Sequence, residues 1–337
     1  MPQPDDSSVS YPKVVIWLLT ARCNLECCHC YAARFLGGKE LSKGEALRVV
    51  ENAAKAGVKH IGFSGGEVFL RQDALDVIGR AFGLGMSTSV VTNGTVLSEE
   101  IAQRLADYGT RTFLSIDGAR KETHERIRGK GTWDAAILAA EKLRKYKVKF
   151  STIMAASKLN YEEASDYLSL ARKLGAKAGC LIPMMPAGRA TAELILNAEE
   201  MVILLQEIDK AANELEFPAS LWCTPFAKLV VKSGYVFADY CRGSAGEMDV
   251  DPEGNVLLCD VLDIVVGNVR EKEVLQAWRE QEKNRLVNSL TNPKVPPPCL
   301  DCPLSQQCRG GCFARAQLMA GDIYAPDPLC PRVAGLI

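Results

Sequence analysis

The stretch Val14-Val-Ile-Trp-Leu-Leu-Thr-Ala-Arg-Cys-Asn-Leu-Glu-Cys-Cys-His-Cys-Tyr31 joins a strand-sized apolar run, Val14–Leu19, to a loop that is rich in cysteine. Within this loop, Cys23, Cys27 and Cys30 are separated by three and then two residues. Three thiolates on one short loop can hold three irons of a cubane [4Fe–4S] cluster and leave the fourth iron open. Zinc sites instead favour four ligands that come in pairs. The stretch therefore predicts a strand that ends at an iron–sulfur cluster.

The 13 cysteines are unevenly placed, because residues 31–179 contain none. In a chain of 337 residues without a recognisable export signal, such clustering indicates metal ligands rather than disulfides. Cys28, inside the first loop, is interpreted as a spectator thiol, with ligation as the alternative. Cys180 is assigned no role.

From about residue 12 to 215, short β-branched runs alternate with longer helical patterns. The expected strands are Val14–Leu19, His60–Phe63, Ser87–Thr92, Thr112–Ile116, Val148–Met154 and Ala178–Met184. The expected helices are Ser42–Ala56, Arg71–Gly83, Ser98–Tyr108, Thr132–Tyr146, Tyr161–Leu174 and Ala198–Glu214. Six such units predict an α/β fold, a partial (β/α)6 TIM-like barrel whose parallel sheet is covered by helices. In such folds the chemistry gathers at the carboxyl ends of the strands.

The alternation stops near residue 215, and the chain becomes rich in turns and cysteines. We therefore expect an N-terminal tail over residues 1–11, a barrel over 12–220 and a small iron–sulfur domain over 221–337. The segment that holds Pro296-Pro-Pro298 and Gly310-Gly311 has little apolar periodicity. Thiolate–iron bonds would supply stability that this segment lacks.

Composition excludes several classes of partner. The formal net charge of −1 argues against nucleic acid or an anionic membrane held by bulk charge. The longest apolar runs are far too short to span a bilayer. Together with the cysteine pattern, this predicts a redox enzyme of an oxygen-poor cytoplasm.

The cysteine loop, with its ring-bearing residue His29 before the last cysteine, resembles the signature of the radical S-adenosylmethionine (radical SAM) superfamily. In that family the open iron chelates the amino and carboxylate groups of SAM. Further motifs follow the second, third and fourth strands, namely Phe63-Ser-Gly-Gly-Glu67, Thr92-Asn-Gly94 and Ser115-Ile-Asp-Gly118. The family usually has proline after the Gly-Gly-Glu triplet, whereas this chain has Val68.

The resemblance implies which residues face SAM. The backbone at Gly65 and Gly66 would approach it, and Glu67 would receive its ammonium group. Either Ser115 or Asp117 would bind the ribose or the carboxylate. Tyr31 and Asn93 are also expected to face the cofactor. Arg128 would offer a bidentate carboxylate clamp, with a solvated surface charge as the alternative.

The C-terminal cysteines resemble the SPASM extension of radical SAM enzymes, which carries two auxiliary [4Fe–4S] clusters. By that resemblance, the outer cluster is held by Cys299, Cys302, Cys308 and Cys330. The inner cluster is held by Cys241, Cys259 and Cys312. A zinc ribbon would account for Cys299-x2-Cys302 alone but not for the rest of the spacing. The inner cluster lacks a fourth cysteine, so it has an open iron, a non-cysteine ligand or a recruited thiolate. The candidates are Glu247, Asp260 and Cys223.

The resemblance also implies a mechanism. The reduced cluster cleaves SAM to a 5′-deoxyadenosyl radical, which abstracts hydrogen from the substrate, and an auxiliary cluster accepts an electron. A low-potential donor, ferredoxin or flavodoxin, would supply the first electron. Asp260 matches a general base of some relatives, although a hydrogen-bond acceptor near the cluster is the simpler role. A non-catalytic electron carrier is disfavoured, because it would need no SAM-binding motifs.

The resemblance leaves the substrate open. A ribosomal peptide or protein side chain is the first expectation, with oxidation, crosslinking or decarboxylation as the outcome. Because only about a dozen residues precede the first expected strand, leader recognition would need a separate peptide-recognition protein. The alternative is a haem-like tetrapyrrole whose propionates are decarboxylated or removed. Arg189, Arg309 and Arg315 would then pair with propionates, unless they are ordinary surface charges.

Overall fold

The computed structural model describes residues 11–238, 246–291 and 293–337. Within these residues one eleven-stranded sheet has the order β11-β10-β9-β1-β2-β3-β4-β5-β6-β7-β8. Its strands are β1 (Val14–Thr20), β2 (His60–Gly65), β3 (Ser87–Thr92), β4 (Arg111–Ser115), β5 (Phe150–Ala156), β6 (Gly179–Pro183), β7 (Ala219–Leu221), β8 (Val236–Ala238), β9 (Glu247–Val250), β10 (Asn255–Leu257) and β11 (Val265–Asn268). All neighbours from β9 through β1 to β8 pair in parallel, and the β9–β10 and β10–β11 pairs are antiparallel.

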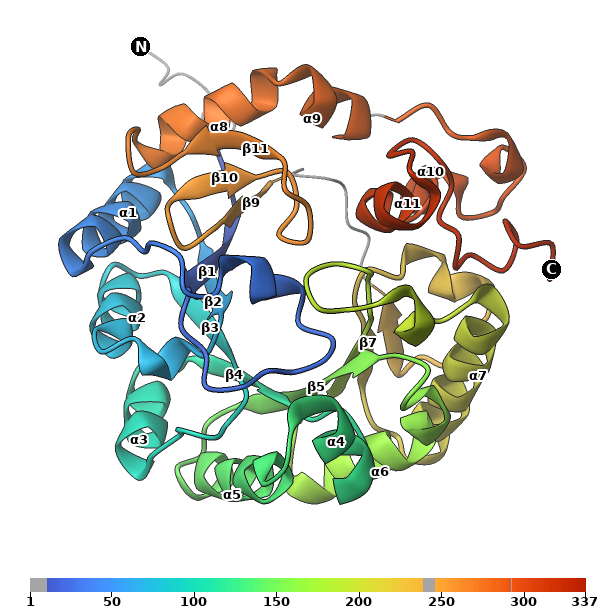
Figure 1. Cartoon of the computed structure of the whole chain (residues 1–337), viewed down its shortest axis with the longest axis horizontal. Helices are drawn as coiled ribbons and strands as arrows, with labels where there is room; N and C mark the ends of the chain where they lie inside the picture. Colours follow the sequence, from blue (N-terminus) through green and yellow to red (C-terminus); the bar gives the residue numbers. More distant parts are fainter. Residues whose placement is uncertain (1–10, 239–245, 292) are drawn as a thin grey trace, which may run out of the picture.

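Helices surround the curved sheet (Figure 1). They are α1 (Lys43–Ala56), α2 (Ala74–Gly83), α3 (Glu99–Asp107), α4 (Lys121–Arg128), α5 (Thr132–Lys145), α6 (Ala164–Leu174), α7 (Ala198–Glu214), α8 (Val274–Lys283), α9 (Arg285–Thr291), α10 (Ser305–Cys308) and α11 (Phe313–Ala320). Among the described residues the sheet does not close, because β8 and β11 lie at its two edges. This open, mainly parallel α/β architecture confirms the predicted fold class.

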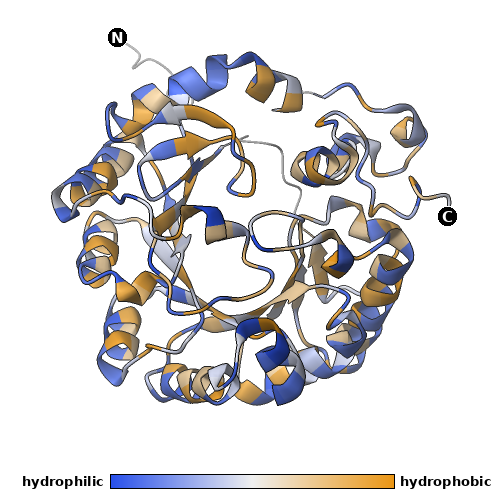
Figure 2. Cartoon of the chain, viewed as in Figure 1, coloured by the Kyte–Doolittle hydropathy of each residue, from blue (hydrophilic) through white to orange (hydrophobic). Residues whose placement is uncertain are grey.

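Local sequence explains why these elements begin and end where they do. The Ser42 side chain accepts a hydrogen bond from the Glu45 backbone, and the Glu45 side chain caps Ser42 in return, so α1 starts with a capping box. The helix ends at Gly57, whose φ of 92° suits a residue without a side chain. The strands are largely hydrophobic, whereas the helices carry both apolar and polar residues (Figure 2). The apolar helix faces can therefore cover the sheet.

The main core lies between the sheet and its helices. Trp17 of β1 and Phe63 of β2 are fully buried there, and their ring centroids lie 6.1 Å apart. Met248 of β9 and Trp278 of α8 belong to the same core. A second, smaller core joins the cysteine-rich segment to the loop after β6, and it contains Met185, Leu262 and Cys312 among others.

The six predicted strands correspond to β1–β6, with ends that differ by at most two residues. Helix α4 and the strands β7–β11 were not predicted from the sequence; β7 and β8 extend the sheet beyond β6, and β9–β11 extend it beyond β1. Because β7 ends at Leu221 and β9 pairs with β1, the segment after residue 220 contributes to the same sheet. The domain boundary at 220 stays a prediction.

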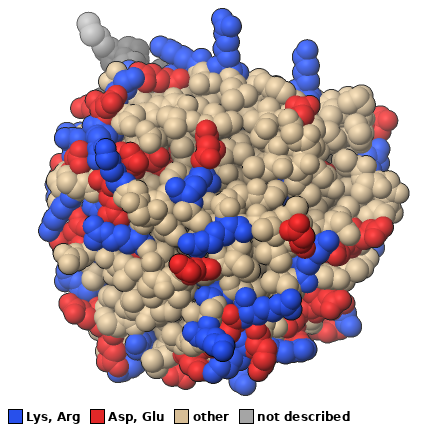
Figure 3. Space-filling model, in the orientation of Figure 1, with Lys and Arg blue, Asp and Glu red and all other residues tan. Residues whose placement is uncertain are grey.

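Charged side chains are unevenly distributed over the face of the molecule where the loop after β1 lies. They gather toward the periphery and the lower half, and uncharged surface covers most of the area over the cysteine-rich C-terminal part (Figure 3). In the described part of the chain, no helix is both long and apolar enough to cross a membrane.

Candidate active site and metal centres

The loop after β1 lies over the centre of the ring of strands (Figure 1). Its three predicted ligands, Cys23, Cys27 and Cys30, face one another closely enough that their charges interact. Burial raises the pKa of Cys27 to about 11, and the negative charges of Asp117 and the other two thiols add to that effect. Burial likewise raises the pKa of Cys23 and Cys30. Three converging thiols on one loop fit a cluster with three protein ligands, and its binding would displace their protons.

The glycines after β2 allow the cluster loop to pack against the sheet. A Cβ atom on Gly66 would lie 2.0 Å from the carbonyl oxygen of Arg22, and one on Gly65 would lie 2.6 Å from that of Thr20. Gly65 also has a φ of 121°, which favours glycine. The next residue, Glu67, donates its backbone N–H to Arg22 at 2.7 Å. The protein itself therefore requires both glycines, before any cofactor is considered.

The side chain of Glu67 ties the end of β2 to the end of β3. One carboxylate oxygen accepts from the Thr92 hydroxyl at 2.8 Å, and the other accepts from the Asn93 backbone N–H at 2.8 Å. Burial raises the pKa of Glu67, although these hydrogen bonds oppose that effect. The Asn93 side chain donates to Asn24 in the cluster loop at 3.2 Å. These contacts fix the mouth of the barrel around the three cysteines.

Asp117 organises a buried charged group at the end of β4. Its carboxylate lies 2.5 Å from Nε of Arg128 and 3.3 Å from Nε2 of His29, and it accepts from the Ala155 N–H at 2.7 Å. Burial alone would raise the pKa of Asp117, but Arg128 and His29 outweigh it, so the pKa lies below its ordinary value. Arg128 has 11% of its side chain exposed and is no surface charge. Ser115 is buried beside this group on β4.

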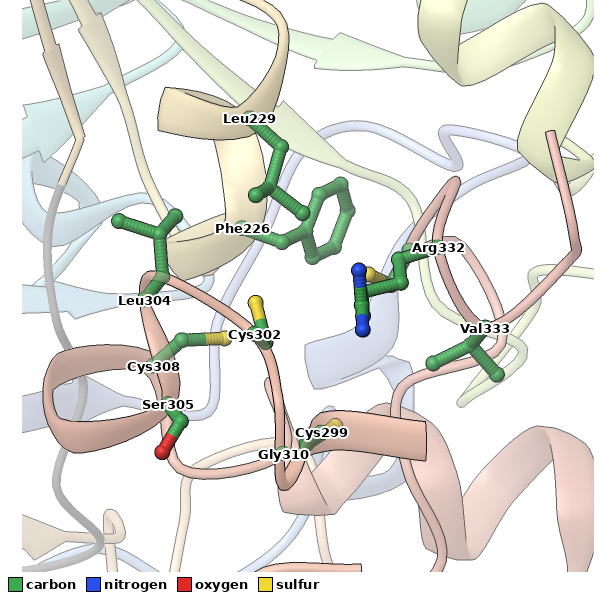
Figure 4. A pocket seen from close by; sticks show the side chains of 11 residues that line it. Phe226, Leu229, Cys299, Cys302, Leu304, Ser305, Cys308, Gly310, Arg332 and Val333 are labelled. Atoms are coloured by element: carbon green, nitrogen blue, oxygen red, sulfur yellow. The ribbon is translucent and has the colours of Figure 1, made fainter. Parts of the chain in front are cut away.

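The four predicted ligands of the outer cluster come together. Cys299, Cys302, Cys308 and Cys330 line one small pocket beside Phe226 (Figure 4). Burial, followed by the charges of neighbouring thiols, raises the pKa of Cys299 to about 11 and that of Cys308 to about 12. Four thiols around a common space are the donor set of a fully ligated [4Fe–4S] cluster. The residues present therefore fit the predicted group.

The inner set is described only in part, because Cys241 lies outside the described residues. Cys259 and Cys312 both pack in the second core. A hydrogen bond with the side chain of Cys223 is the main reason that the pKa of Cys312 falls to about 7. Glu247 is exposed on β9.

Asp260 is held by the residue that follows the first cluster loop. The hydroxyl of Tyr31 donates to its Oδ2 at 2.8 Å, and the backbone N–H of Asp260 donates to Asp249 at 2.9 Å. Burial raises the pKa of both carboxyl groups, and the Asp260 charge raises that of Asp249 further. Asp249 was not predicted from the sequence, because an isolated aspartate in a short strand carries no signal of its partner eleven residues later.

The three arginines proposed for propionates differ in their surroundings. Arg315 is fully buried and pairs with Asp327 at 2.7 Å, so it is not available to a substrate. Arg309 donates through Nη1 to the Thr291 carbonyl at 2.7 Å. Arg189 follows Gly188, which packs on the carbonyl of Cys30, and its buried Nη1 has no hydrogen-bond partner among the described residues. Of the three, Arg189 alone presents an unpaired cationic nitrogen next to the first cluster loop.

The chain is similar to known families and proteins. The model of the radical SAM superfamily matches residues 17–171, and the model of SPASM, an iron–sulfur cluster-binding domain, matches residues 241–303. The "AdoMet-dependent heme synthase" of Methanosarcina barkeri is 30% identical, and the alignment covers 95% of this chain and 96% of the relative. The "PqqA peptide cyclase" of Rhizobium meliloti is 28% identical, with 95% and 87% covered. Streptococcus suis SuiB, solved with its precursor peptide SuiA, is 16% identical with a TM-score of 0.76 over 95% of this chain and 76% of SuiB, and shares the fold.

Proposed function

The chain belongs to the radical SAM superfamily and carries a SPASM iron–sulfur cluster-binding domain, and on this premise we propose that it oxidises propionate side chains of a haem-type tetrapyrrole. It is an enzyme, and its cofactors are iron–sulfur clusters and SAM. When bound, these cofactors supply a hydrogen-atom acceptor and a one-electron acceptor. Cys23, Cys27 and Cys30 would hold the cluster that binds SAM.

The polar residues around the three cysteines would hold SAM in place. Glu67, fixed by Thr92 and Asn93, would present its carboxylate to the ammonium group. Arg128 lies beside the thiols, since its charge lowers the pKa of Cys27, and Asp117 holds its Nε. Its remaining nitrogens would serve a carboxylate. Asp117 then acts as a positioning residue, because its own carboxylate is already occupied.

Two auxiliary clusters are part of the proposal. The outer one would be held by Cys299, Cys302, Cys308 and Cys330, which line the pocket of Figure 4. The inner one would be held in part by Cys241, Cys259 and Cys312. Replacing Cys299 by alanine should remove iron and product formation while some uncoupled SAM cleavage continues. Full turnover by Cys299→Ala would contradict this assignment. Asp260, with its raised pKa, stays a proposed proton acceptor near the inner cluster.

Two observations favour a tetrapyrrole over a peptide. The haem synthase of Methanosarcina barkeri matches this chain over 96% of its own length. In addition, the unpaired, buried Nη1 of Arg189 beside the first cluster loop would bind a carboxylate such as a propionate. The net reaction would convert a propionate to a vinyl group with loss of carbon dioxide, one hydrogen atom and one electron.

A ribosomal peptide is the second candidate, because the PqqA peptide cyclase matches this chain at nearly the same identity. A short precursor-peptide gene beside the gene for this chain would favour it, and tetrapyrrole-pathway genes would favour the first candidate.

Anaerobic turnover with iron coproporphyrin III, SAM and dithionite tests the proposal by mass spectrometry. We expect masses that correspond to the loss of carbon dioxide and two hydrogens from a propionate. Arg189→Ala should raise the KM for the porphyrin, whereas Arg120→Ala, a surface control, should not. An unchanged porphyrin, in a preparation that cleaves SAM, would exclude this substrate but leave the radical chemistry intact.

A further inference from the structure

A cavity of about 490 Å³ lies at the end of the barrel away from the first cluster loop. It is lined by residues at or just before the first positions of β4, β5 and β6, among them Arg111, Lys149 and Lys177. Because these strands are parallel to β1, their amino ends lie at one edge of the sheet and the cluster loop, which follows β1, lies at the other. No residue proposed to hold iron or SAM lines this cavity.

The wall of the cavity is the inner face of the curved sheet. Leu114 belongs to the core between the sheet and the helices, so its neighbour Phe113 points to the inside of the barrel. The rings of Phe113 and Trp222 meet edge to face, with centroids 5.0 Å apart. The indole N–H of Trp222 donates to the Ser220 hydroxyl at 3.2 Å, which turns the ring back along β7 toward the cavity. The cavity therefore has an aromatic wall.

The rim of the cavity carries charge of one sign. Arg111, Lys149 and Lys177 are exposed, and no acidic residue is among the side chains that line the cavity. In the part of the chain that the structure describes, none of these three cations forms an ion pair with a carboxylate. A hollow lined by one sign of charge concentrates counter-ions. The rim therefore favours an anionic ligand.

The wall and the rim together indicate a flat apolar molecule that carries carboxylates. The volume of the cavity is within the roughly 300–1,000 Å³ of small-molecule sites. Arg111 can bind a carboxylate through two parallel hydrogen bonds, and the two lysines act as point charges. A free phosphate would pair with the cations but would leave the aromatic wall without a contact. A tetrapyrrole with propionate side chains satisfies both parts.

The position of the cavity also fits the proposed reaction. Arg189, proposed to bind a propionate beside the first cluster loop, follows the carboxyl end of β6, whereas Lys177 precedes its amino end. The five residues of β6 span roughly 16 Å, a length comparable to that of a tetrapyrrole with its side chains. A substrate with one propionate near Arg189 would place the propionates of its far edge near the cavity.

We propose that Arg111, Lys149 and Lys177 bind the propionates that do not react, while the tetrapyrrole ring packs against Phe113 and Trp222. The assignment rests on the proposed function, because it takes a haem-type tetrapyrrole as the substrate. It involves ion pairs and hydrogen bonds and no covalent step. The end of the barrel opposite the first cluster would then determine which edge of the tetrapyrrole faces the radical.

The test measures binding of iron coproporphyrin III to the reconstituted full-length chain under anaerobic conditions, from the change in porphyrin absorbance. The tetramethyl ester of the same porphyrin, kept in solution by a mild detergent, is the matched ligand because it has the ring but no carboxylate. Lys149→Gln should raise the Kd of the acid about fivefold, and Lys149→Gln combined with Arg111→Gln should raise it more than about tenfold. The Kd of the ester should be the same in these variants and in the native chain.

Three further variants control for other effects. Lys149→Arg keeps the charge and should bind the acid as the native chain does. Lys55→Gln removes an exposed charge on α1, outside the cavity, and should leave both Kd values unchanged. Phe113→Leu should weaken the acid and the ester alike, because it removes a ring contact and no charge. An unchanged Kd for the acid in the double variant, or an equal rise with Lys55→Gln, would overturn the assignment.

Binding and turnover together separate this assignment from the proposed function. Binding that depends on the rim charges, without any change in the mass of the porphyrin, would contradict the proposed function and support the cavity as a tetrapyrrole site. Normal turnover with unaltered binding in the rim variants would overturn the cavity assignment alone. A native chain that does not bind the acid would overturn both.

Discussion

Gly66 shows how little room the fold leaves around the first cluster loop. A Cβ atom there would lie 2.0 Å from the backbone oxygen of Arg22, a distance that no small side-chain movement can relieve. The loop would have to shift, and its three cysteines would shift with it. Because glycine has a hydrogen atom where alanine has a methyl group, Gly66 allows the three proposed metal ligands to converge.

Gly66→Ala should therefore lower the iron bound by the N-terminal cluster severalfold, as measured by iron and sulfide analysis after reconstitution. Gly44→Ala is the matched control, because a Cβ on Gly44, in the first turn of α1, meets no atom within 4 Å. It should bind iron normally and stabilise the helix by roughly 0.5–1 kcal/mol. Equal iron content in the two variants would mean that the loop tolerates displacement.

Site residues whose partners are close in the sequence could be predicted, whereas residues whose partners are distant in the sequence could not. Cys23, Cys27 and Cys30 are neighbours on one loop, so their spacing alone indicated a common metal. Arg315 is neither the propionate contact nor the ordinary surface charge that the sequence left as alternatives, since its partner Asp327 and the Cys223 carbonyl are apparent only in the folded chain. The expectation that either Ser115 or Asp117 binds the ribose or the carboxylate of SAM stays a prediction, and in the folded chain the Asp117 carboxylate pairs with Arg128.

At the scale of elements, the loop between β10 and β11 is fastened to the segment that follows the first cluster loop. Arg34 donates to the carbonyl oxygens of Asp260, Val261 and Leu262, at 2.6, 3.3 and 3.3 Å, and contacts Asp263 at 2.5 Å. This loop contains Cys259, a proposed inner ligand. These contacts would therefore set the position of the proposed inner cluster relative to the first.

Arg34→Ala should release this loop, because one side chain supplies all four contacts. Hydrogen exchange should speed up at the amides of residues 258–264 by about tenfold or more, in line with hydrogen bonds from a charged donor worth roughly 1.5–3 kcal/mol. Arg48→Ala, which removes one exposed contact to the Arg270 carbonyl, serves as the control. Unchanged protection in the Arg34 variant would show that packing alone holds the loop.

Sequence patterns predicted the long elements well and the short ones poorly. The β1–β6 strands and their helices have strong periodicity, whereas β7 and β8 have three residues each, too few for a pattern to show, and they join the sheet through pairing with β6 and with each other. Helix α4 lacks an apolar stripe, since only His124 and Ile127 are buried in it. It brings Arg128 close to the cysteines of the first cluster loop.

At the scale of the whole molecule, the barrel and the C-terminal segment differ in what stabilises them. The barrel has a large apolar core that includes β9 and α8, whereas the segment from residue 296 onward has few buried apolar side chains and five of the proposed iron ligands. Iron should therefore matter far more to the C-terminal segment than to the barrel.

Removing iron with a chelator under reducing conditions should leave the barrel strands protected from hydrogen exchange while residues 296–337 lose protection. Reconstitution with iron and sulfide should restore it. Loss of protection across the entire chain would mean that the barrel also depends on the clusters. No change in the C-terminal segment would contradict a structural role for iron.

The central claim is that three thiols at the mouth of this barrel support radical chemistry on SAM. Formation of 5′-deoxyadenosine from SAM by the anaerobically reconstituted, dithionite-reduced chain measures this most directly. We predict that the native sequence produces 5′-deoxyadenosine and that Cys23→Ala, with its C-terminal clusters intact, produces none. An iron-loaded native protein that leaves SAM uncleaved, and whose cluster spectrum is unaffected by SAM, would contradict the account.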